Sequence, residues 1–352
     1  MIPGRSSALA RTLAVVYTLL VVYASLYPFT GWRDTGIPLF AFLGAGWPRW
    51  YSVFDIVVNV LAYIPLGFFW LPVITARFGR IGGIVFTCAM LSLLSGTMET
   101  IQNFLPSRVA SNLDLACNSL GAWLGVLAAW RWSNLLLSEN RLLRWRHRHL
   151  AQEPGGDYGV LLLGIWLFVQ LSPEDLLFGN GNLRVLFDLP AALPFDAADF
   201  ARYETLIALS GTLTIGLLAS LVLRRPRGWH LLVLLAGAAT IRSFAAALLV
   251  DPDNFTRWLT DANLAGMCIG ALLMWPLLHL GEGIRRILAA MLVLATAALV
   301  NIAPDNPYLQ QATQVWRQGH FLNFNGLTRA ASSLWPFLTI AFLMWQGRNE
   351  RG

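Results

Sequence analysis

The sequence predicts an all-α fold, a polytopic transmembrane helical bundle of about ten spanning helices. Charged residues make up 12% of the chain, about half the share found in a soluble globular domain, and the mean hydropathy is +0.57. Apolar stretches of about 20 residues recur along the chain, which is the length a helix needs to cross a hydrocarbon core of about 30 Å. A helix also satisfies its own backbone hydrogen bonds in lipid. The chain is therefore expected to lie largely within a membrane.

Ten apolar stretches account for the predicted spans. They are residues 8–27, 54–74, 81–101, 113–132, 157–171, 203–223, 229–250, 259–280, 284–302 and 329–346. The first follows Arg5 and Arg11, as the apolar region of a signal peptide would. However, Tyr27-Pro28-Phe29 stands where a cleavage site with small residues would be, which predicts an uncleaved helix. The fifth stretch, which ends at Leu171-Ser172-Pro173, is the shortest.

The arginines predict the orientation of these spans. If all ten stretches cross, one side of the membrane carries Arg5, Arg11, Arg77, Arg80, Arg131, Arg141, Arg144, Arg146, Arg148, Arg224, Arg225, Arg227, Arg285, Arg286, Arg348 and Arg351. The opposite loops carry most of the acids, namely Glu174, Asp175, Asp188, Asp196, Asp199, Asp251, Asp253 and Asp305. Because basic residues concentrate in cytoplasmic loops, the arginine-rich side is predicted to be cytoplasmic, with both termini on it.

An internal repeat is indicated by matches at an offset of 145 to 149 residues. Leu26-Tyr27-Pro28 matches Leu171-Ser172-Pro173, Asp55 and Gly67 match Glu204 and Gly216, and Asn118, Gly121 and Gly125 match Asn263, Gly266 and Gly270. The interpretation is a four-helix unit over 1–132, a basic cytoplasmic linker over 133–156, a degenerate second unit over 157–281 and a C-terminal helical pair over 282–352. An even number of helices gives both units the same orientation.

Polar side chains of the first unit gather at the predicted outer ends of its helices. They are Asp55, Asn59, Glu99, Gln102, Arg108, Asp114 and Asn118. Asp55 and Asn59 share one helical face, as do Asp114 and Asn118, because each pair is four residues apart. An ionised group inside a span costs about 2.5 to 3.5 kcal/mol, so these groups are expected to face one another or a wet cavity.

Two interpretations of this cluster stay open. It can be a structural network that fixes the helix ends. Alternatively, it can be a ligand site in which Arg108 clamps a phosphate or carboxylate while Glu99 and Asp114 accept hydrogen bonds or exchange protons. Asp55 then fits better as a partner that orients Arg108 or Asn118 than as a direct ligand.

The spacing of these residues resembles that of the VanZ-like family. The matching pattern is Asp55-x3-Asn59 with Pro65-Leu66-Gly67, followed by Glu99-x2-Gln102-x5-Arg108-x5-Asp114-x3-Asn118-x2-Gly121-x3-Gly125. The resemblance covers roughly the first 130 residues. It implies an integral membrane protein of a family named for teicoplanin resistance, and it carries over no settled biochemical mechanism.

The second unit departs from this pattern. Glu204 replaces the Asp, Ala208 replaces the Asn, and Asp261 is out of register with Asp114. Arg242 lies well inside the seventh stretch, where an unpaired guanidinium is costly, so Glu204 or Asp261 is its expected partner.

The leading functional hypothesis is a non-enzymatic protein that handles an anionic, lipid-linked envelope precursor at the outer leaflet, with effects on glycopeptide susceptibility or surface-polysaccharide assembly. One alternative is a membrane-embedded phosphohydrolase or transferase acting on polyprenyl-phosphate lipids. Another is a proton-coupled transporter. Membrane lipids are the expected partners, and no nucleic acid is expected. Because the sequence has no His-rich cluster, phosphate-binding Gly loop or Ser-His-Asp arrangement, no metal or cofactor is expected.

Overall fold

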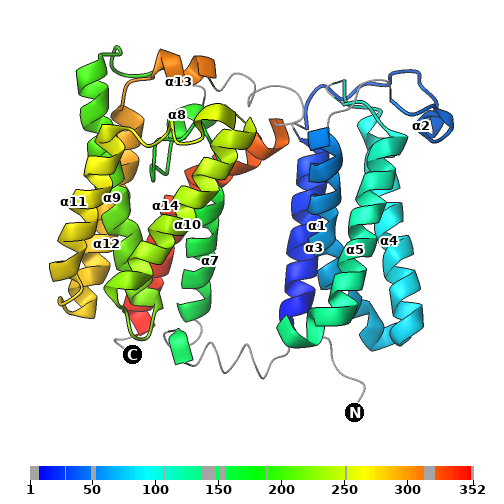
Figure 1. Cartoon of the computed structure of the whole chain (residues 1–352), viewed down its shortest axis with the longest axis horizontal. Coiled ribbons are helices and arrows are strands. Elements are labelled where there is room, and N and C mark those ends of the chain that lie inside the picture. The colour runs from blue at the N-terminus through cyan, green and yellow to red at the C-terminus, as the bar shows by residue number, and fades with distance from the viewer. Residues whose placement is uncertain are drawn as a thin grey trace. The chain divides into compact units, whose positions relative to one another are not determined.

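The computed structural model describes residues 8–27, 29–48, 53–106, 108–136, 148–150, 155–187, 189–249, 252–312 and 322–349. These residues are helical with connecting loops (Figure 1), and their β-structure is limited to an isolated bridge between Leu150 and Leu223. Most of the predicted basic linker and several of the arginines used to predict the orientation lie outside the described residues. The predicted all-helical class is confirmed.

Each of the ten predicted stretches coincides with a helix. These helices are α1 (Ala8–Leu26), α3 (Val53–Phe78), α4 (Arg80–Gln102), α5 (Asn112–Leu136), α7 (Gly155–Val169), α9 (Ala197–Val222), α10 (Gly228–Leu249), α11 (Asp261–Leu277), α12 (Glu282–Ile302) and α14 (Leu322–Asn349). In the part of the chain that the structure describes, seven helices are long and apolar enough to cross a membrane. Three further apolar helices are shorter, over Leu13–Leu26, Gly155–Val169 and Asp261–Leu277.

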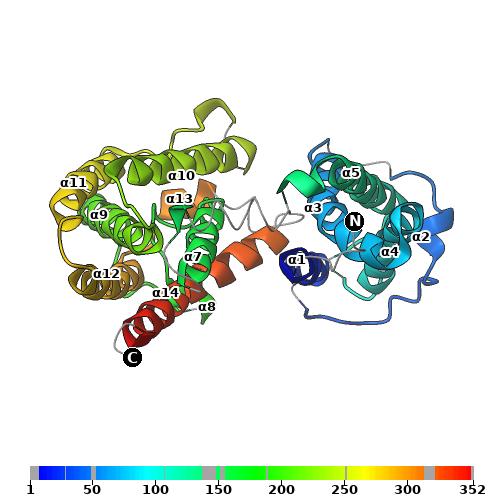
Figure 2. The same ribbon diagram turned by 90° about the horizontal axis from the view of Figure 1, so that it is seen from below.

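The chain divides into two compact units, Met1–Trp145 and Arg146–Gly352. In the first unit, α1, α3, α4 and α5 form a bundle, and α3 packs most extensively on α5 (Figure 2). The close approach of α3 and α5 depends on glycine. A Cβ atom added at Gly121 would lie 2.1 Å from the Val60 carbonyl oxygen, and one at Gly125 would lie 2.0 Å from the Ile64 carbonyl oxygen. Small residues permit such backbone contact between helices in lipid.

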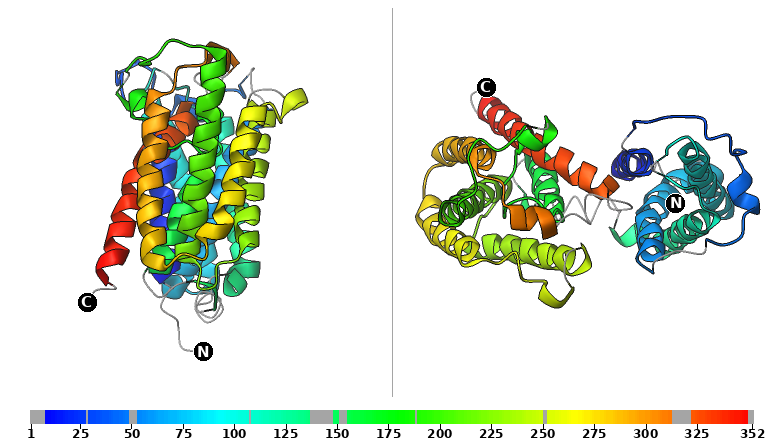
Figure 3. Two further views of the ribbon diagram at one scale, coloured as in Figure 1. Left: turned by 90° about the vertical axis from the view of Figure 1, so that its left-hand side faces the viewer. Right: turned by 90° about the horizontal axis from the view of Figure 1, so that it is seen from above.

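The second unit is built around α9, which packs against α7, α10, α11 and α12 (Figures 2 and 3). Almost the whole of α9 from Ile207 to Val222 is buried. The helix begins at an N-cap, since the Asp196 side chain accepts hydrogen bonds from the backbone nitrogens of Ala198 and Asp199. The short helices α8 (Leu183–Leu186) and α13 (Pro307–Ala312) and a 3-10 turn over Pro252–Asn254 lie in the connections.

The contact between α9 and α11 repeats the contact between α3 and α5 at a fixed interval. A Cβ atom at Gly266 would lie 2.4 Å from the Thr205 carbonyl oxygen, and one at Gly270 would lie 3.0 Å from the Leu209 carbonyl oxygen. All four of these residues stand 145 positions after their counterparts Gly121, Val60, Gly125 and Ile64. The two helix pairs therefore pack in the same register.

Candidate polar site at the helix ends of the first unit

The predicted polar residues of the first unit lie at one end of its bundle. Asp55 is in the first turn of α3, Glu99 is in the last turn of α4, and Asp114 is in the first turn of α5. Arg108 lies in the loop that joins α4 to α5. Because successive helices run in opposite directions, these positions meet at the end of the unit where α1 also ends (Figure 1).

Glu99, Arg108 and Asp114 form the charged centre of this site. They lie close enough that each charge acts on the other two. Glu99 is 3% exposed, and its Oε2 accepts a hydrogen bond of 2.8 Å from the backbone nitrogen of Ser111. A carboxylate so deeply buried requires such partners, because a bare charge would pay a large desolvation penalty. The cluster thus brings one cation close to two acids.

Arg108 is partly buried within the loop. Its Nη2 donates a hydrogen bond of 3.4 Å to the Tyr27 carbonyl oxygen, and its backbone nitrogen donates one of 2.9 Å to Leu105. Burial lowers the pKa of the guanidinium from its ordinary value, whereas the carboxylates of Glu99 and Asp114 act to raise that pKa. A guanidinium keeps its charge under such conditions.

The amide side chains connect this centre to neighbouring helices. Asn59 donates a hydrogen bond of 2.8 Å from its Nδ2 to Oδ1 of Asp114, which joins α3 to α5. Asn118 donates one of 3.0 Å to the Ser95 hydroxyl, which joins α5 to α4. Gln102 donates one of 2.8 Å to the Ser25 carbonyl oxygen, which joins α4 to α1. Six of the seven predicted residues thus have described contacts in one connected region.

The seventh, Asp55, lies one helical turn before Asn59. The structure gives Asp55 a polar interaction of its own, and its predicted role in orienting Arg108 or Asn118 stays a prediction. Cys, His, Asp and Glu side chains in groups of three or more do not gather as a metal site anywhere in the described ranges.

Sequence analysis did not identify three residues of the site. Ser95 receives the Asn118 bond, and Tyr63 lies close enough to interact with Ser95 and Glu99. Ser111 precedes α5, and its hydroxyl accepts from the backbone nitrogens of Leu113 and Asp114. A serine directly before an apolar helix is a recognisable N-cap signal, so Ser111 was accessible to sequence analysis. A hydroxyl inside an apolar stretch, as in Tyr63 and Ser95, gives no such signal.

The second unit contains a different arrangement. Arg242 is 6% exposed, its Nη2 donates to the backbone carbonyl oxygen of Asp175, and it interacts electrostatically with Asp175 and then with Glu204. Glu204 accepts hydrogen bonds of 3.3 Å from Thr260 and from Asn263. Sequence analysis named Glu204 as an expected partner of Arg242. It did not name Asp175, which lies in the loop after α7.

The helix register also assigns Glu204 a different counterpart. Glu204 follows Asn59 by 145 residues, the interval that relates Gly266 to Gly121, whereas the sequence match paired it with Asp55. In the packing, Glu204 therefore takes the place of Asn59 and contacts Asn263, the counterpart of Asn118.

Burial raises the pKa of the Asp175 carboxyl to about 6, against the lowering effect of Arg242.

The apolar helices and the buried polar cluster at their ends define a multi-pass membrane protein of the α-helical class. Residues 11–136 match the family model described as VanZ/LLP1, so this part of the chain is a VanZ/LLP1 family domain, and the resemblance predicted for the first unit is confirmed. The matched range includes all seven predicted site residues of that unit. No match was found among curated proteins or among solved structures.

Proposed function

We propose that the VanZ/LLP1 domain binds the head group of an anionic, lipid-linked cell-envelope precursor and presents it without changing it chemically. The single observation that carries this proposal is the position of Arg108, a partly buried cation close to Glu99 and Asp114 at the ends of the helices. Through such handling the protein would affect glycopeptide susceptibility or surface-polysaccharide assembly.

One contact of Arg108, which also has other interactions within the protein, is weak enough to exchange for a ligand. Its bond to the Tyr27 carbonyl oxygen is long, at 3.4 Å. A phosphate oxygen would form a shorter and stronger bond, because both partners are charged and the guanidinium can bind two oxygens at once. The neighbouring carboxylates can accept hydrogen bonds from hydroxyl groups. A phosphate linked to a sugar offers both kinds of group, which is why a lipid-linked sugar precursor fits better than a bare anion.

The proposed orientation places this site at the outer leaflet of a bacterial inner membrane, with both termini in the cytoplasm. The support is the charge asymmetry, since the turn between α3 and α4, at the opposite end of the unit, carries Arg77 and Arg80. We also propose that the two units derive from duplication of a four-helix unit, followed by a C-terminal helical pair. The support is the 145-residue interval shared by the glycine contacts of α5 and α11.

Lipids that co-purify with the protein test the proposed function. Wild-type protein and an Arg108→Ala variant are purified in mild detergent from a bacterial host, and their bound lipids are identified by native mass spectrometry. The wild type should retain polyprenyl-phosphate lipids and Arg108→Ala should lose most of them. Arg33→Ala is the matched control, because Arg33 is an exposed arginine at the same end of the unit. Equal retention by wild type and Arg108→Ala would overturn the proposal.

A second candidate function is hydrolysis or group transfer on a polyprenyl-phosphate lipid. The observation that favours it is the burial of Glu99 beside Arg108, since a shielded carboxyl next to a phosphate-binding cation can act as a general acid or base. Turnover by the purified protein that disappears in Glu99→Gln, with lipid binding retained, would favour this candidate over simple binding.

A third candidate, proton-coupled transport, draws on the proposed duplication, because transporters often contain parallel repeats. The charged cluster of the first unit lies at the helix ends and not at mid-helix, where transporters bind substrate. Flux into proteoliposomes that responds to a pH gradient would favour transport.

A further inference from the structure

The second unit contains a cavity of about 180 Å³ that the proposed function does not use. Its lining includes Asp175 from the loop after α7, Glu204 from α9, Arg242 from α10, Arg257 from the loop before α11, and Asn263 from α11. A cavity of this size accommodates a small polar group, because pockets for drug-sized ligands measure about 300 to 1,000 Å³. The side chains that surround it decide which group fits.

Two residues that line this cavity have buried acceptor atoms without a partner among the described residues. They are Oδ1 of Asn263, a residue that is 4% exposed, and Oδ2 of Asp175. An unsatisfied buried acceptor costs free energy comparable to a lost hydrogen bond. Glu204 adds a third acceptor, since its described donors are the neutral groups of Thr260 and Asn263. A ligand that supplies hydrogen-bond donors would satisfy this region.

Arg257 adds an anion-binding group at the same cavity. It is exposed, and within the described ranges no acidic side chain forms an ion pair with it. Arg242, in contrast, is buried. Its Nη2 donates to the backbone carbonyl oxygen of Asp175, and the carboxylates of Asp175 and Glu204 act on it electrostatically, but its Nε has no hydrogen-bond partner among the described residues. The described lining residues include two acids and two arginines, whose ionised charges sum to zero. A net-neutral ligand with separated positive and negative groups therefore matches this cavity better than an anion.

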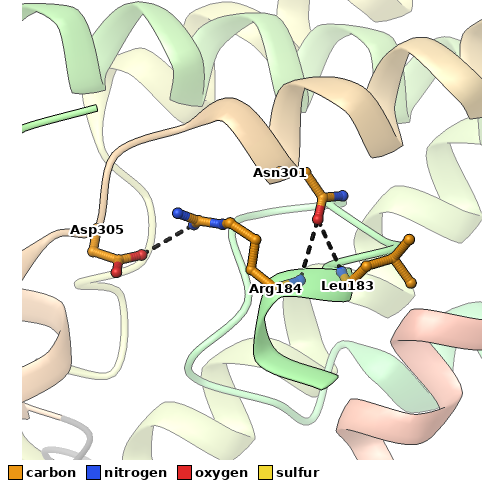
Figure 4. Close-up of polar contacts among 4 residues, drawn as sticks. All are labelled: Leu183, Arg184, Asn301 and Asp305. Carbon is orange, nitrogen blue, oxygen red and sulfur yellow. Dashed lines mark hydrogen bonds and ion pairs between the residues drawn. The ribbon is translucent and has the colours of Figure 1, made fainter. Parts of the chain in front are cut away.

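A neighbouring cavity of about 260 Å³ differs in how its arginines are paired. Its two arginines are both paired, Arg184 with Asp305 at 3.0 Å and Arg329 with Glu174 at 2.7 Å. Figure 4 shows the Arg184 guanidinium directed at Asp305. Asn301 accepts hydrogen bonds from the backbone nitrogens of Leu183 and Arg184 in the same view, so the start of α8 is fixed as well. Each arginine of this larger cavity thus has an acidic partner, although Nε and Nη1 of Arg184 are buried without a hydrogen-bond partner among the described residues.

The loop that carries Asp175 contains a strained residue directly after Leu177, which lines the cavity. Phe178 has a φ of 61°, a left-handed conformation that is costly for a bulky residue, and its side chain is 1% exposed. Such strain persists where the surrounding structure enforces it, and it is frequent at ligand sites. The strained loop thus holds Asp175 beside Arg242.

From these observations we infer that the second unit binds a zwitterionic aminoalkyl phosphate, the head-group chemistry of phosphoethanolamine. The ammonium donates to Glu204, Asp175 and Asn263, and the phosphate binds the guanidinium of Arg257. The site is independent of the head-group site proposed for the first unit, because it shares no residue with it.

Binding to the purified full-length protein tests this inference. The probe is dihexanoyl phosphatidylethanolamine, titrated in phospholipid-free detergent and followed by native mass spectrometry. Dihexanoyl phosphatidylcholine, whose ammonium has no N–H donor, and dihexanoyl phosphatidylglycerol, which is anionic, are the comparison lipids. The ethanolamine lipid should bind at least about tenfold more tightly than either, because charge-assisted hydrogen bonds are lost with both. Free phosphoethanolamine, run in parallel, shows whether the acyl chains contribute.

Two variants and two matched controls assign the site. Arg257→Gln and Glu204→Gln should each weaken binding about tenfold or more, whereas Arg227→Gln and Glu282→Gln should leave it unchanged. Arg227 is an exposed arginine that begins the connection to α10, and Glu282 lies at the start of α12. Because Arg257 is exposed, its substitution is not expected to impair folding even if Glu204→Gln does.

Three results would overturn the inference. Equal affinity for the ethanolamine and choline lipids, tighter binding of the glycerol lipid, or full binding by Arg257→Gln would each contradict it. Arg108→Ala should bind the ethanolamine lipid as the wild type does. Failure of the first-unit proposal and failure of this inference can therefore be distinguished.

Discussion

The buried guanidinium of Arg242 donates to the backbone carbonyl oxygen of Asp175 and interacts electrostatically with the Asp175 carboxylate. Removing one of two interacting buried charges leaves the other uncompensated, which typically costs about 3 to 5 kcal/mol. Arg242→Met should therefore lower the free energy of unfolding in detergent by about 3 kcal/mol or more. The double variant Arg242→Met with Asp175→Asn should recover part of that loss. A double variant as unstable as the single one would contradict this assignment.

Asp175 also predicts a pH dependence of stability. Its pKa of about 6 in the folded protein lies above the ordinary value of 3.8, so the folded state binds the proton more tightly than the unfolded state between those values. The contribution of Asp175 to stability is therefore fully present below about pH 4 and is lost as the pH rises through about 6. Thermal unfolding of the wild type and of Asp175→Asn, measured from pH 4 to pH 7, checks this. The variant should lack this part of the pH dependence, and identical profiles would contradict it.

The charged residues of the first site were predictable because a lone charge in or beside an apolar stretch is energetically unfavourable. Glu99 and Asp114 sit at the ends of apolar stretches, where only mutual contact or water offsets the cost of a charge. Asp175 lies in a loop outside every predicted span, so its burial could not be expected from hydropathy. Its partner Arg242 was recognised as needing an acid, but the choice among acids depends on the loop conformation.

At the scale of helices, the glycines of α5 decide how closely α3 approaches. Gly121→Ala would place a Cβ atom 2.1 Å from the Val60 carbonyl oxygen, which forces the two backbones apart. We expect a loss of about 2 kcal/mol or more in unfolding free energy, the scale of overpacking a tight core. Thermal unfolding in detergent measures this effect.

Gly96→Ala on α4 is the matched control for Gly121→Ala. Its Cβ atom would meet Leu115 at 3.9 Å, an ordinary contact. Replacing glycine by alanine inside a helix then favours folding by up to about 1 kcal/mol. If both substitutions changed stability equally, the helix contact would not be what requires Gly121.

Helix positions were predictable and helix ends were less so. The sequence predicted a span over 203–223, but α9 begins at Ala197 because Asp196 caps it in a polar segment that hydropathy does not register. Similarly, α14 begins at Leu322, ahead of the predicted start at residue 329. The register of α9 against α11 also could not be predicted from the sequence. The sequence match paired Glu204 with Asp55, so it did not give α9 the 145-residue interval that the helix contacts show.

For the whole molecule, the proposed orientation gives opposite exposure to two loops. Val109, which is 85% exposed beside Arg108, should face the cell exterior, and the exposed Arg225 should face the cytoplasm. In a background without Cys88, Cys117 and Cys268, Val109→Cys should react with a membrane-impermeant maleimide on intact spheroplasts and Arg225→Cys should not. A permeant maleimide, which should label both, is the control. Labelling of Arg225→Cys alone would reverse the orientation.

The predicted division of the chain into four segments stays a prediction, and the structure gives two compact units. A basic, polar stretch separates two sets of apolar segments, and the structure divides the chain at Trp145 and Arg146, within that stretch. The ordered polar pattern identified the family of residues 11–136. The cavities of the second unit were not predictable, because they arise where loops, α8 and α13 meet the helix ends.

The most direct test of the central claim is an equilibrium titration of the full-length protein in nanodiscs with a polyprenyl phosphate. The wild type and Arg33→Ala should bind it saturably. Arg108→Ala should bind it about tenfold or more weakly, because a charge-assisted contact to phosphate is lost. Equal affinity of Arg108→Ala and wild type would contradict the assignment of Arg108 as the anion-binding group of this domain.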